Sequence, residues 1–219
     1  CAPSRVLAAG GGGEVGGFAA VAMAQGWVLA ATDYRGLGTP GPHPYLVGQL
    51  AGRDVLDIVR AAAHLPETGM DASSPVILVG HSQGGGASVF AAELAPGYAA
   101  ELDVVGAVAG APTTEIARRI SSWPPSRGQD TGFAMMAIAG FHGAYGRLDE
   151  SSVLTAEGQA ALPAVEEGCV GDVLASFADE DPASLFTPAG PDGDWRVALE
   201  ANVAGQRPTE VPIYVFHGD

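Results

Sequence analysis

The stretch 75–94, PVILVGHSQGGGASVFAAEL, places the strongest constraint on how this chain can fold. Its residues 80–84, GHSQG, match the pattern G-x-S-x-G. A buried-strand pattern precedes them at 76–79, and a helical pattern rich in small residues follows at 87–94. This order of strand, turn and helix is the context of a nucleophile elbow, a strained turn that exposes a reactive serine. Ser82 is therefore the candidate nucleophile.

The residues around Ser82 fit the same interpretation. In a nucleophile elbow the tight turn leaves no room for side chains two residues before and two residues after the serine, which suits Gly80 and Gly84. The backbone N–H of Gln83 would then face a carbonyl oxygen as it becomes negative, forming one half of an oxyanion hole. His81 cannot reach round to deprotonate its own neighbour, and we assign it no catalytic role. The plain alternative is a glycine-rich turn that holds an ordinary serine.

Composition limits the size and the function class of the protein. A chain of 219 residues is long enough for one full domain and too short for two large ones. Its 25 acidic and 10 basic residues give a net charge of −15, which disfavours nucleic acid and anionic lipid surfaces as partners. All the basic residues are arginine, so Schiff-base chemistry, pyridoxal phosphate attachment and a P-loop lysine are excluded.

The two cysteines, Cys1 and Cys169, leave two interpretations open. They form one disulfide in an exported protein, or they are two unrelated buried thiols. Neither has a neighbouring ligand at useful spacing, so we expect no metal site, and we expect no cofactor. The longest apolar run, 18–31, is interrupted and too short to span a bilayer. The chain begins with a cysteine rather than a methionine and shows no signal peptide.

A second glycine-rich motif lies near the start of the chain. Gly11-x-Gly13-x-x-Gly16, followed by Asp33 at the end of an apolar run, has the spacing of a dinucleotide-binding fingerprint. Such a loop would bind a pyrophosphate. Against this, 5–9 predicts only a short strand or a loop, and a chain with 32 glycines produces the spacing easily by chance. Dinucleotide binding is kept as the alternative from a different functional class.

The remaining periodicity predicts an α/β fold. Beyond the elbow, we expect helices over 18–25 and 49–65 and strands over 27–32, 103–109 and 211–216. This alternation indicates a mostly parallel sheet with helices on both faces.

A long stretch separates the last two of these strands. It is much longer than a crossover between parallel strands requires. We therefore expect a helical cap at 112–208, inserted between core segments 1–111 and 209–219. Its apolar segment 133–145 would either line a pocket over Ser82 or pack the core of the cap itself.

Four strings in this chain resemble the secretory lipases, the lipase A type, of the α/β-hydrolase fold. They are DYRGLG at 33–38, HPYLVG at 43–48, VLDIVRAA at 55–62 and GHSQGG at 80–85. The resemblance implies a secreted serine hydrolase that cleaves acylglycerols or similar lipid esters, with Ser82 as nucleophile and Gln83 at the oxyanion hole. The cap would serve as a lid with transient contact to a lipid interface, and no obligate protein partner is evident. A short-chain esterase or an acyltransferase of the same fold is the alternative.

The triad partners of Ser82 are not all expected within these 219 residues. In this fold the order along the chain is serine, acid, histidine. His217-Gly218 resembles the usual lead-in His-Gly-x-x-Asp, which places the acid two residues beyond Asp219 and the histidine further on. The resemblance places the second oxyanion donor before Cys1. We therefore expect a fragment that is incomplete at both ends.

Three alternatives to this assignment concern the same residues. Asp219 itself could serve as the acid, although it is off register. His43 is a candidate base by chemical type, but it lies upstream of Ser82, and a loop histidine that bonds the backbone is the simpler interpretation. An inactive binding module with a hydrolase fold is the third.

Overall fold

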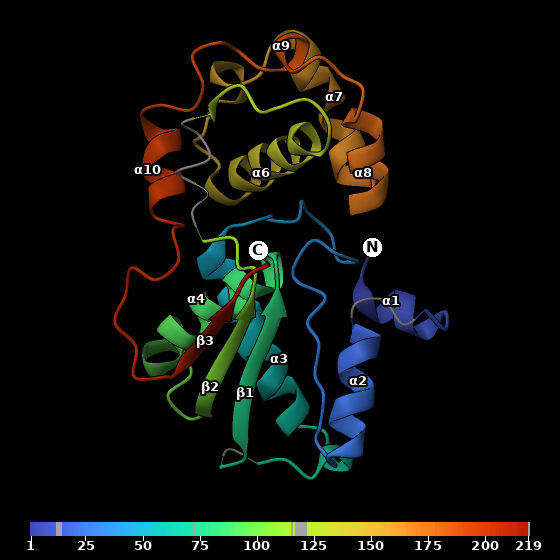
Figure 1. Cartoon of the computed structure of the whole chain (residues 1–219), viewed down its shortest axis with the longest axis vertical. Coiled ribbons are helices and arrows are strands. Elements are labelled where there is room, and N and C mark those ends of the chain that lie inside the picture. Colours follow the sequence, from blue (N-terminus) through green and yellow to red (C-terminus); the bar gives the residue numbers. More distant parts are fainter. Residues whose placement is uncertain (12–14, 72, 115, 117–121, 219) are drawn as a thin grey trace. The chain divides into compact units, whose positions relative to one another are not determined.

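A computed structural model of the chain describes residues 1–11, 15–71, 73–114, 116 and 122–218 (Figure 1). The chain divides into two compact units. Unit 1 consists of Cys1–Thr39, Gly48–Pro112 and Gly205–Asp219, and unit 2 consists of Pro40–Val47 and Thr113–Ala204.

Unit 1 is built on a parallel sheet. Its strands lie in the order β1 (Pro75–His81), β2 (Asp103–Gly110) and β3 (Ile213–Phe216). Both pairings are parallel. The carboxyl ends of the strands therefore meet at one edge of the sheet, where the residues that follow each strand come together. The expected α/β class and the strands near 76–79, 103–109 and 211–216 are confirmed.

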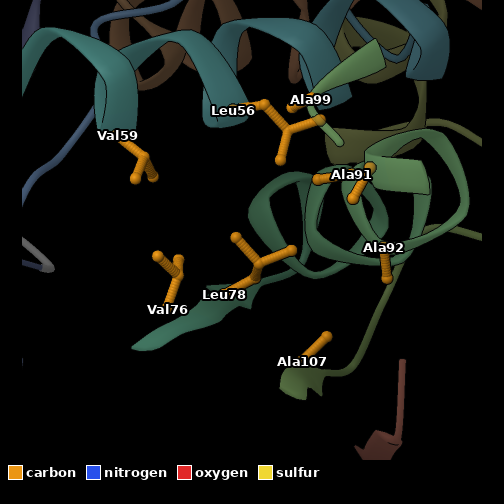
Figure 2. Packing of buried hydrophobic residues seen from close by; sticks show 9 residues of the cluster. Leu56, Val59, Val76, Leu78, Ala91, Ala92, Ala99 and Ala107 are labelled. Atoms are coloured by element: carbon orange, nitrogen blue, oxygen red, sulfur yellow. The ribbon is translucent and has the colours of Figure 1, made fainter. Parts of the chain in front are cut away.

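Two helices, α3 (Gly48–Ala63) and α4 (Gln83–Tyr98), cover one face of this sheet (Figure 1). In Figure 2, Leu56 of α3 points towards Leu78 of β1, with Ala91 of α4 and Ala107 of β2 close by. Leu56 and Ala91 are fully buried. Residues of α3 at helical spacing supply its buried face, as the periodicity of 49–65 predicts.

Small residues let α3 and α4 approach closely. A Cβ atom added at Gly48 would lie 2.0 Å from the ring of Phe90, and one added at Gly52 would lie 2.9 Å from the backbone nitrogen of Ala91. Helix α4 is buried on nearly all sides, which explains why its sequence is apolar without a polar face. The glycines of α3 thus set the distance between the two helices.

The opposite face of the sheet carries exposed apolar side chains. Ile77 and Val79 of β1 are each about half exposed, and so is Val105 of β2. Tyr214 of β3 is 67% exposed. We expected helices on both faces, and the hydrophobic cluster of the described residues places α3 and α4 on one face of the sheet.

The N-terminal part of unit 1 differs from the sequence prediction. Residues 5–9, expected as a strand or a loop, fall largely within helix α1 (Pro3–Ala8), and α2 (Val15–Ala24) follows near the expected 18–25. The expected strand at 27–32 is wrong, because these residues have no regular secondary structure. An apolar run becomes a strand only when a neighbour pairs with its backbone N–H and C=O groups.

Unit 2 is helical. Its elements are α6 (Gln129–Tyr145), η3 (Glu150–Ser152), α7 (Ala156–Glu167), α8 (Val170–Phe177), α9 (Pro182–Leu185) and α10 (Asp194–Glu200), whereas the short η1 (Pro66–Thr68) belongs to unit 1. Helix α6 packs on α7 and α8, and its Met135 and Phe141 are fully buried. A Cβ atom at Gly140 of α6 would lie 2.4 Å from the backbone nitrogen of Tyr45, so the segment 40–47 lies directly against this helix. The apolar segment 133–145 therefore packs the core of unit 2.

Two further expectations concern cysteine chemistry and membranes. Neither Cys1 nor Cys169 is a free thiol in the structure, which favours disulfide bonding over two free buried thiols. Within the described ranges, no helix has the length and apolar character needed to cross a membrane.

Candidate active site

Ser82 stands in a strained turn between β1 and α4. Its backbone has φ 53° and ψ −114°, a conformation that non-glycine residues rarely adopt. The Ser82 N–H donates to the carbonyl oxygen of Gly110 at 2.9 Å, and the Gly86 N–H donates to the carbonyl oxygen of Ser82 at 3.0 Å. Both backbone groups of the serine are thus fixed, and strain of this kind persists only where the surroundings hold it.

The turn is crowded on one side of the serine. A Cβ atom at Gly80 would lie 2.0 Å from the carbonyl oxygen of Gly84, so any side chain at position 80 would force the turn open. We expected the same crowding at Gly84. There, however, the nearest described atom would be the hydroxyl oxygen of Tyr34, at an ordinary contact distance of 3.9 Å.

The second crowded position is Gly85 rather than Gly84. A Cβ atom at Gly85 would lie 2.7 Å from the carbonyl oxygen of Gly110 and 3.0 Å from the Cα of Pro112. The first turn of α4 therefore packs against the end of β2 and the residues that follow it. The expectation failed at Gly84 because crowding depends on which strand end packs on the helix, and a pattern of spacing does not contain that information.

The end of β2 is itself fixed by β3. Ala111 has a positive φ of 39°, and its N–H donates to the carbonyl oxygen of Phe216 at 2.7 Å. The residues after β3, His217 and Gly218, leave the sheet at the same edge as Ser82 because the strands are parallel. The carboxyl edge of a parallel sheet is where α/β proteins place their ligands and their reacting groups.

Gln83 is the first residue of α4, a helix of 16 residues. The first N–H groups of a helix have no partner within the helix, and they lie at the positive end of its dipole. The Gln83 N–H therefore lies at the positive end of the α4 dipole, directly after Ser82 in the chain. His81, the last residue of β1, is exposed.

Tyr34 is the residue at this site that sequence reasoning missed. Its hydroxyl oxygen lies beside Gly84, and burial, with the Asp54 carboxylate as the second cause, raises the pKa of Tyr34 to about 12. The only signal in the sequence was that Tyr34 belongs to the string at 33–38, which we used for the family resemblance. No chemical property of the sequence pointed to a role for this tyrosine.

The residues of the dinucleotide fingerprint do not form the expected arrangement. The segment before Gly11 is helix α1 and not a strand, and Gly16 lies within α2. Asp33 accepts hydrogen bonds from the backbone N–H of Ser4 at 2.7 Å and from its hydroxyl at 2.5 Å. Gly13 is outside the described residues. The strand, loop and helix that a pyrophosphate site requires are therefore not assembled by the residues that the structure describes.

Two further candidates belong to unit 2 or fall outside the described residues. His43 belongs to unit 2, and Asp219 is not among the described residues. Among the residues that are described, no group of three or more His, Cys, Asp and Glu side chains is placed to hold a metal ion. Unit 2 contains a cavity of about 210 Å³ beside Phe177 and Leu185, with Glu157 and Glu180 in its lining.

Comparisons with known proteins place the chain in a family. The sequence profile described as "Secretory lipase" matches residues 17–188. Lipase A of Arthroderma benhamiae is 32% identical over 203 residues, which cover 89% of this chain and 42% of that protein. Secreted triacylglycerol lipase LIP5 of Malassezia furfur is 27% identical over 208 residues, covering 88% of this chain and 52% of the relative.

A solved structure shares the fold. The X-ray structure of Candida antarctica lipase A superposes with a TM-score of 0.66 at 24% identity, covering 80% of this chain and 42% of that one. This structural likeness confirms the expected α/β-hydrolase fold. This chain spans about half the length of the curated relatives that it matches. With most of its residues matched by one family profile, the chain belongs to the secretory lipase family.

Proposed function

We propose that this protein is a secreted, serine-dependent carboxylic-ester hydrolase that acts on triacylglycerols or similar lipid esters. The observation that carries the proposal is the turn at Ser82, where a non-glycine residue holds φ 53° between a parallel strand and a buried helix. A serine in an ordinary glycine-rich turn has no need of such a conformation, which costs on the order of 1–3 kcal/mol. The names of the relatives support lipid esters as the substrate and secretion as the destination.

The mechanism that we propose is acyl transfer in two steps. The Ser82 hydroxyl oxygen attacks the ester carbonyl carbon while a histidine takes its proton, and the oxyanion accepts a hydrogen bond from the Gln83 N–H. The carbon–oxygen bond to the alcohol then breaks, the histidine returns the proton to the leaving alkoxide, and an acyl-enzyme remains. Water, deprotonated by the same histidine, attacks the acyl-enzyme and releases the carboxylic acid and Ser82.

The acid and the histidine of this mechanism come, in our proposal, from residues beyond Asp219. Two features support this. His217 and Gly218 leave the sheet at the edge that carries Ser82 and resemble the lead-in to the acid of this fold. The relatives are about twice as long as this chain.

Unit 2 is the candidate lid. It is helical, and its main segment, Thr113–Ala204, is inserted in the chain between β2 and β3. We propose that this insertion shapes the binding site for the acyl chain and makes transient contact with a lipid interface. An ester chain-length series, run with and without an alcohol acceptor, separates a lipase from a short-chain esterase and from an acyltransferase.

The test of the nucleophile is covalent labelling of the natural protein that contains this chain. A fluorophosphonate probe should label Ser82, and a peptide mass spectrum should locate the label. Ser82→Ala should abolish labelling and lower ester turnover by about 10³-fold or more, with little change in the melting temperature. Turnover near the wild-type level in this variant would rule out the assignment.

A second serine of the same helix provides the matched control. The Ser88 hydroxyl is buried and donates to the carbonyl oxygen of Gly84 at 2.9 Å, so its role is structural. Ser88→Ala should keep the label on Ser82. A protein that takes no label at all would instead support an inactive member of the fold.

A further inference from the structure

Tyr34 has an unusual backbone conformation for so large a residue. Its φ is 58°, in the left-handed region where bulky side chains are outliers. The other non-glycine residues with positive φ among the described residues are Leu46, Ser82 and Ala111. Three of these four lie in unit 1. Ser82 forms the elbow, the Tyr34 hydroxyl lies beside its Gly84, and Ala111 follows Gly110, whose carbonyl oxygen accepts from the Ser82 N–H. Strained backbone in this unit is therefore concentrated around the candidate nucleophile.

Hydrogen bonds on both sides of Tyr34 hold this conformation. The Tyr34 N–H donates to the hydroxyl oxygen of Thr32 at 3.0 Å. The N–H of Arg35 donates to the carboxylate of Asp54 at 3.1 Å, and the Arg35 guanidinium forms an ion pair with the same carboxylate at 2.8 Å. The Gly36 N–H donates to the Thr39 hydroxyl at 2.9 Å. The loop therefore fixes the position of Tyr34 from its own backbone and from helix α3.

The hydroxyl oxygen of Tyr34 lies beside the first turn of α4. A Cβ atom at Gly84 would meet the Tyr34 hydroxyl oxygen at 3.9 Å. The backbone of α4 itself and the residues next to Gly84 are left aside. Among the other described residues, the Tyr34 hydroxyl oxygen is the only heavy atom within 4 Å of this Cβ position. Tyr34 thus lies beside the turn at Gly84, whereas the end of β2 packs on the turn at Gly85.

The environment of this hydroxyl favours its protonated form. Burial is the larger cause that raises the pKa of Tyr34 to about 12, and the Asp54 carboxylate is the second. A phenol of ordinary pKa already keeps its proton at neutral pH, and the raised pKa of Tyr34 moves ionisation further away, so the hydroxyl brings no charge to the elbow. A group in this state cannot act as the general base, but it can hold its surroundings by packing and by hydrogen bonding.

We propose that Tyr34 is a positioning residue of the nucleophile elbow, whose partly buried side chain restrains the first turn of α4 at Gly84 and so fixes the directions of the Ser82 hydroxyl and the Gln83 N–H. This inference rests on the proposed function of Ser82. In this proposal Tyr34 acts through the turn rather than on the reacting atoms. Its loss should therefore slow the chemical step and leave substrate binding nearly unchanged.

The experiment compares two tyrosine variants in the natural protein that contains this chain. Tyr34→Phe should lower kcat, and the rate of fluorophosphonate labelling, by about tenfold or more, because small displacements of a reacting group are costly. KM should change by less than about twofold, since ground-state binding is retained.

The matched control is Tyr98→Phe. Tyr98 lies at the far end of α4, and its hydroxyl donates to the Asp57 carboxylate at 2.8 Å. This variant also removes a tyrosine hydroxyl from unit 1, and it should lower the melting temperature without changing kcat. A fall in kcat in Tyr98→Phe as large as that in Tyr34→Phe would show that the effect is general loss of stability, and would overturn the proposal.

A double-mutant cycle tests whether the Tyr34 hydroxyl is coupled to position 84. Gly84→Ala adds a methyl group at the Tyr34 hydroxyl, at a distance that the fold tolerates. Labelling rates are expressed relative to the wild-type rate. The relative rate of the double variant Tyr34→Phe with Gly84→Ala should differ by about threefold or more from the product of the relative rates of the two single variants, because neighbouring residues have non-additive effects. Gly84→Ala combined with Tyr98→Phe should show no such coupling. Additive effects in the first pair would overturn the proposal.

The outcomes separate this inference from the proposed function. A wild-type protein that takes no label contradicts the function and the inference together. A labelled wild type with an equally reactive Tyr34→Phe contradicts the inference alone. If Tyr34→Phe does not fold, Thr32→Val removes the acceptor of the Tyr34 N–H and leaves the ring unchanged. Slower labelling of that variant then supports the proposal, and labelling at the wild-type rate overturns it.

Discussion

Residues 75–98 and residues 15–32 are both apolar and both belong to unit 1, yet they fold differently. The first segment forms β1 and α4, with a strand that pairs with β2 and a helix that is buried on nearly all sides. The second forms α2, in which Ala22 is the only buried residue, followed by a stretch without regular secondary structure at 27–32. Phe18 is 49% exposed and Met23 is 78% exposed.

The difference teaches what turns an apolar pattern into structure. Strand β1 exists because β2 pairs with its backbone groups, whereas no strand among the described residues pairs with 27–32. A helix likewise gains most of its stability from the surface on which its apolar face packs. Apolar content is therefore necessary for burial, but only a partner makes it sufficient.

The largest expected effect comes from breaking the elbow in the first segment. Gly80→Ala places a methyl group within 2.0 Å of a backbone carbonyl oxygen, so the turn must open. We expect a loss of more than about 3 kcal/mol of unfolding free energy and no fluorophosphonate label on Ser82. Gly84→Ala is the control and should cost less than about 1 kcal/mol. Equal losses in the two variants would contradict the crowding described for Gly80.

A core residue of the same segment should give the next effect. Leu78 is 3% exposed and faces α3 and α4, whereas the preceding residue, Ile77, is 51% exposed on the open face of the sheet. Leu78→Ala should lower the free energy of unfolding by about 2–5 kcal/mol, and Ile77→Ala by less than about 1 kcal/mol. Urea denaturation measures both. Similar losses would mean that the open face is covered.

A smaller effect is expected where α4 ends, at the ion pair between Arg60 and Glu101. The hydrogen bond from Arg60 is the main cause that lowers the pKa of Glu101 from 4.5. Because the pKa is lower in the folded state, the stabilisation is present above pH 4.5 and is lost as the pH falls through the folded value. Glu101→Gln should therefore lower the melting temperature slightly at pH 7. The difference from wild type should disappear at acid pH, and a difference that grows there would contradict the assignment.

The smallest effect is expected in the second segment. Met23→Ser replaces an exposed apolar side chain of α2 and should change the free energy of unfolding by no more than about 0.5 kcal/mol. Thermal denaturation under identical conditions measures the change. A loss above about 1 kcal/mol would show that α2 is packed like α4, and the contrast between the segments would not hold.

Much of the sheet could be predicted from local patterns. The strand before Ser82, the helix after it and the strands near 103–109 and 211–216 follow from apolar runs bounded by glycine, proline or charge. The helix near 49–65 follows from apolar residues at helical spacing. These predictions succeed because each pattern also finds a partner in the fold.

The predictions that failed depend on contacts distant in sequence. The run at 27–32 has the composition of a strand and no partner. Gly84 was expected to be crowded, and Gly85 is crowded instead, because the end of β2 packs on α4 at that residue. Tyr34 carries no chemical signal in the sequence, since its place beside Gly84 depends on a loop that is held by Thr32 and Asp54.

The sequence by itself determined the elbow, since the spacing of glycine and serine between a strand and a helix is a local property of consecutive residues. It also determined the family, through strings that span only a few residues each. Only the tertiary structure decided which glycines are crowded, which apolar faces are covered and which side chain stands beside the turn. These properties depend on distances between segments far apart in the chain, and packing decides them because burial and backbone pairing each need a second surface.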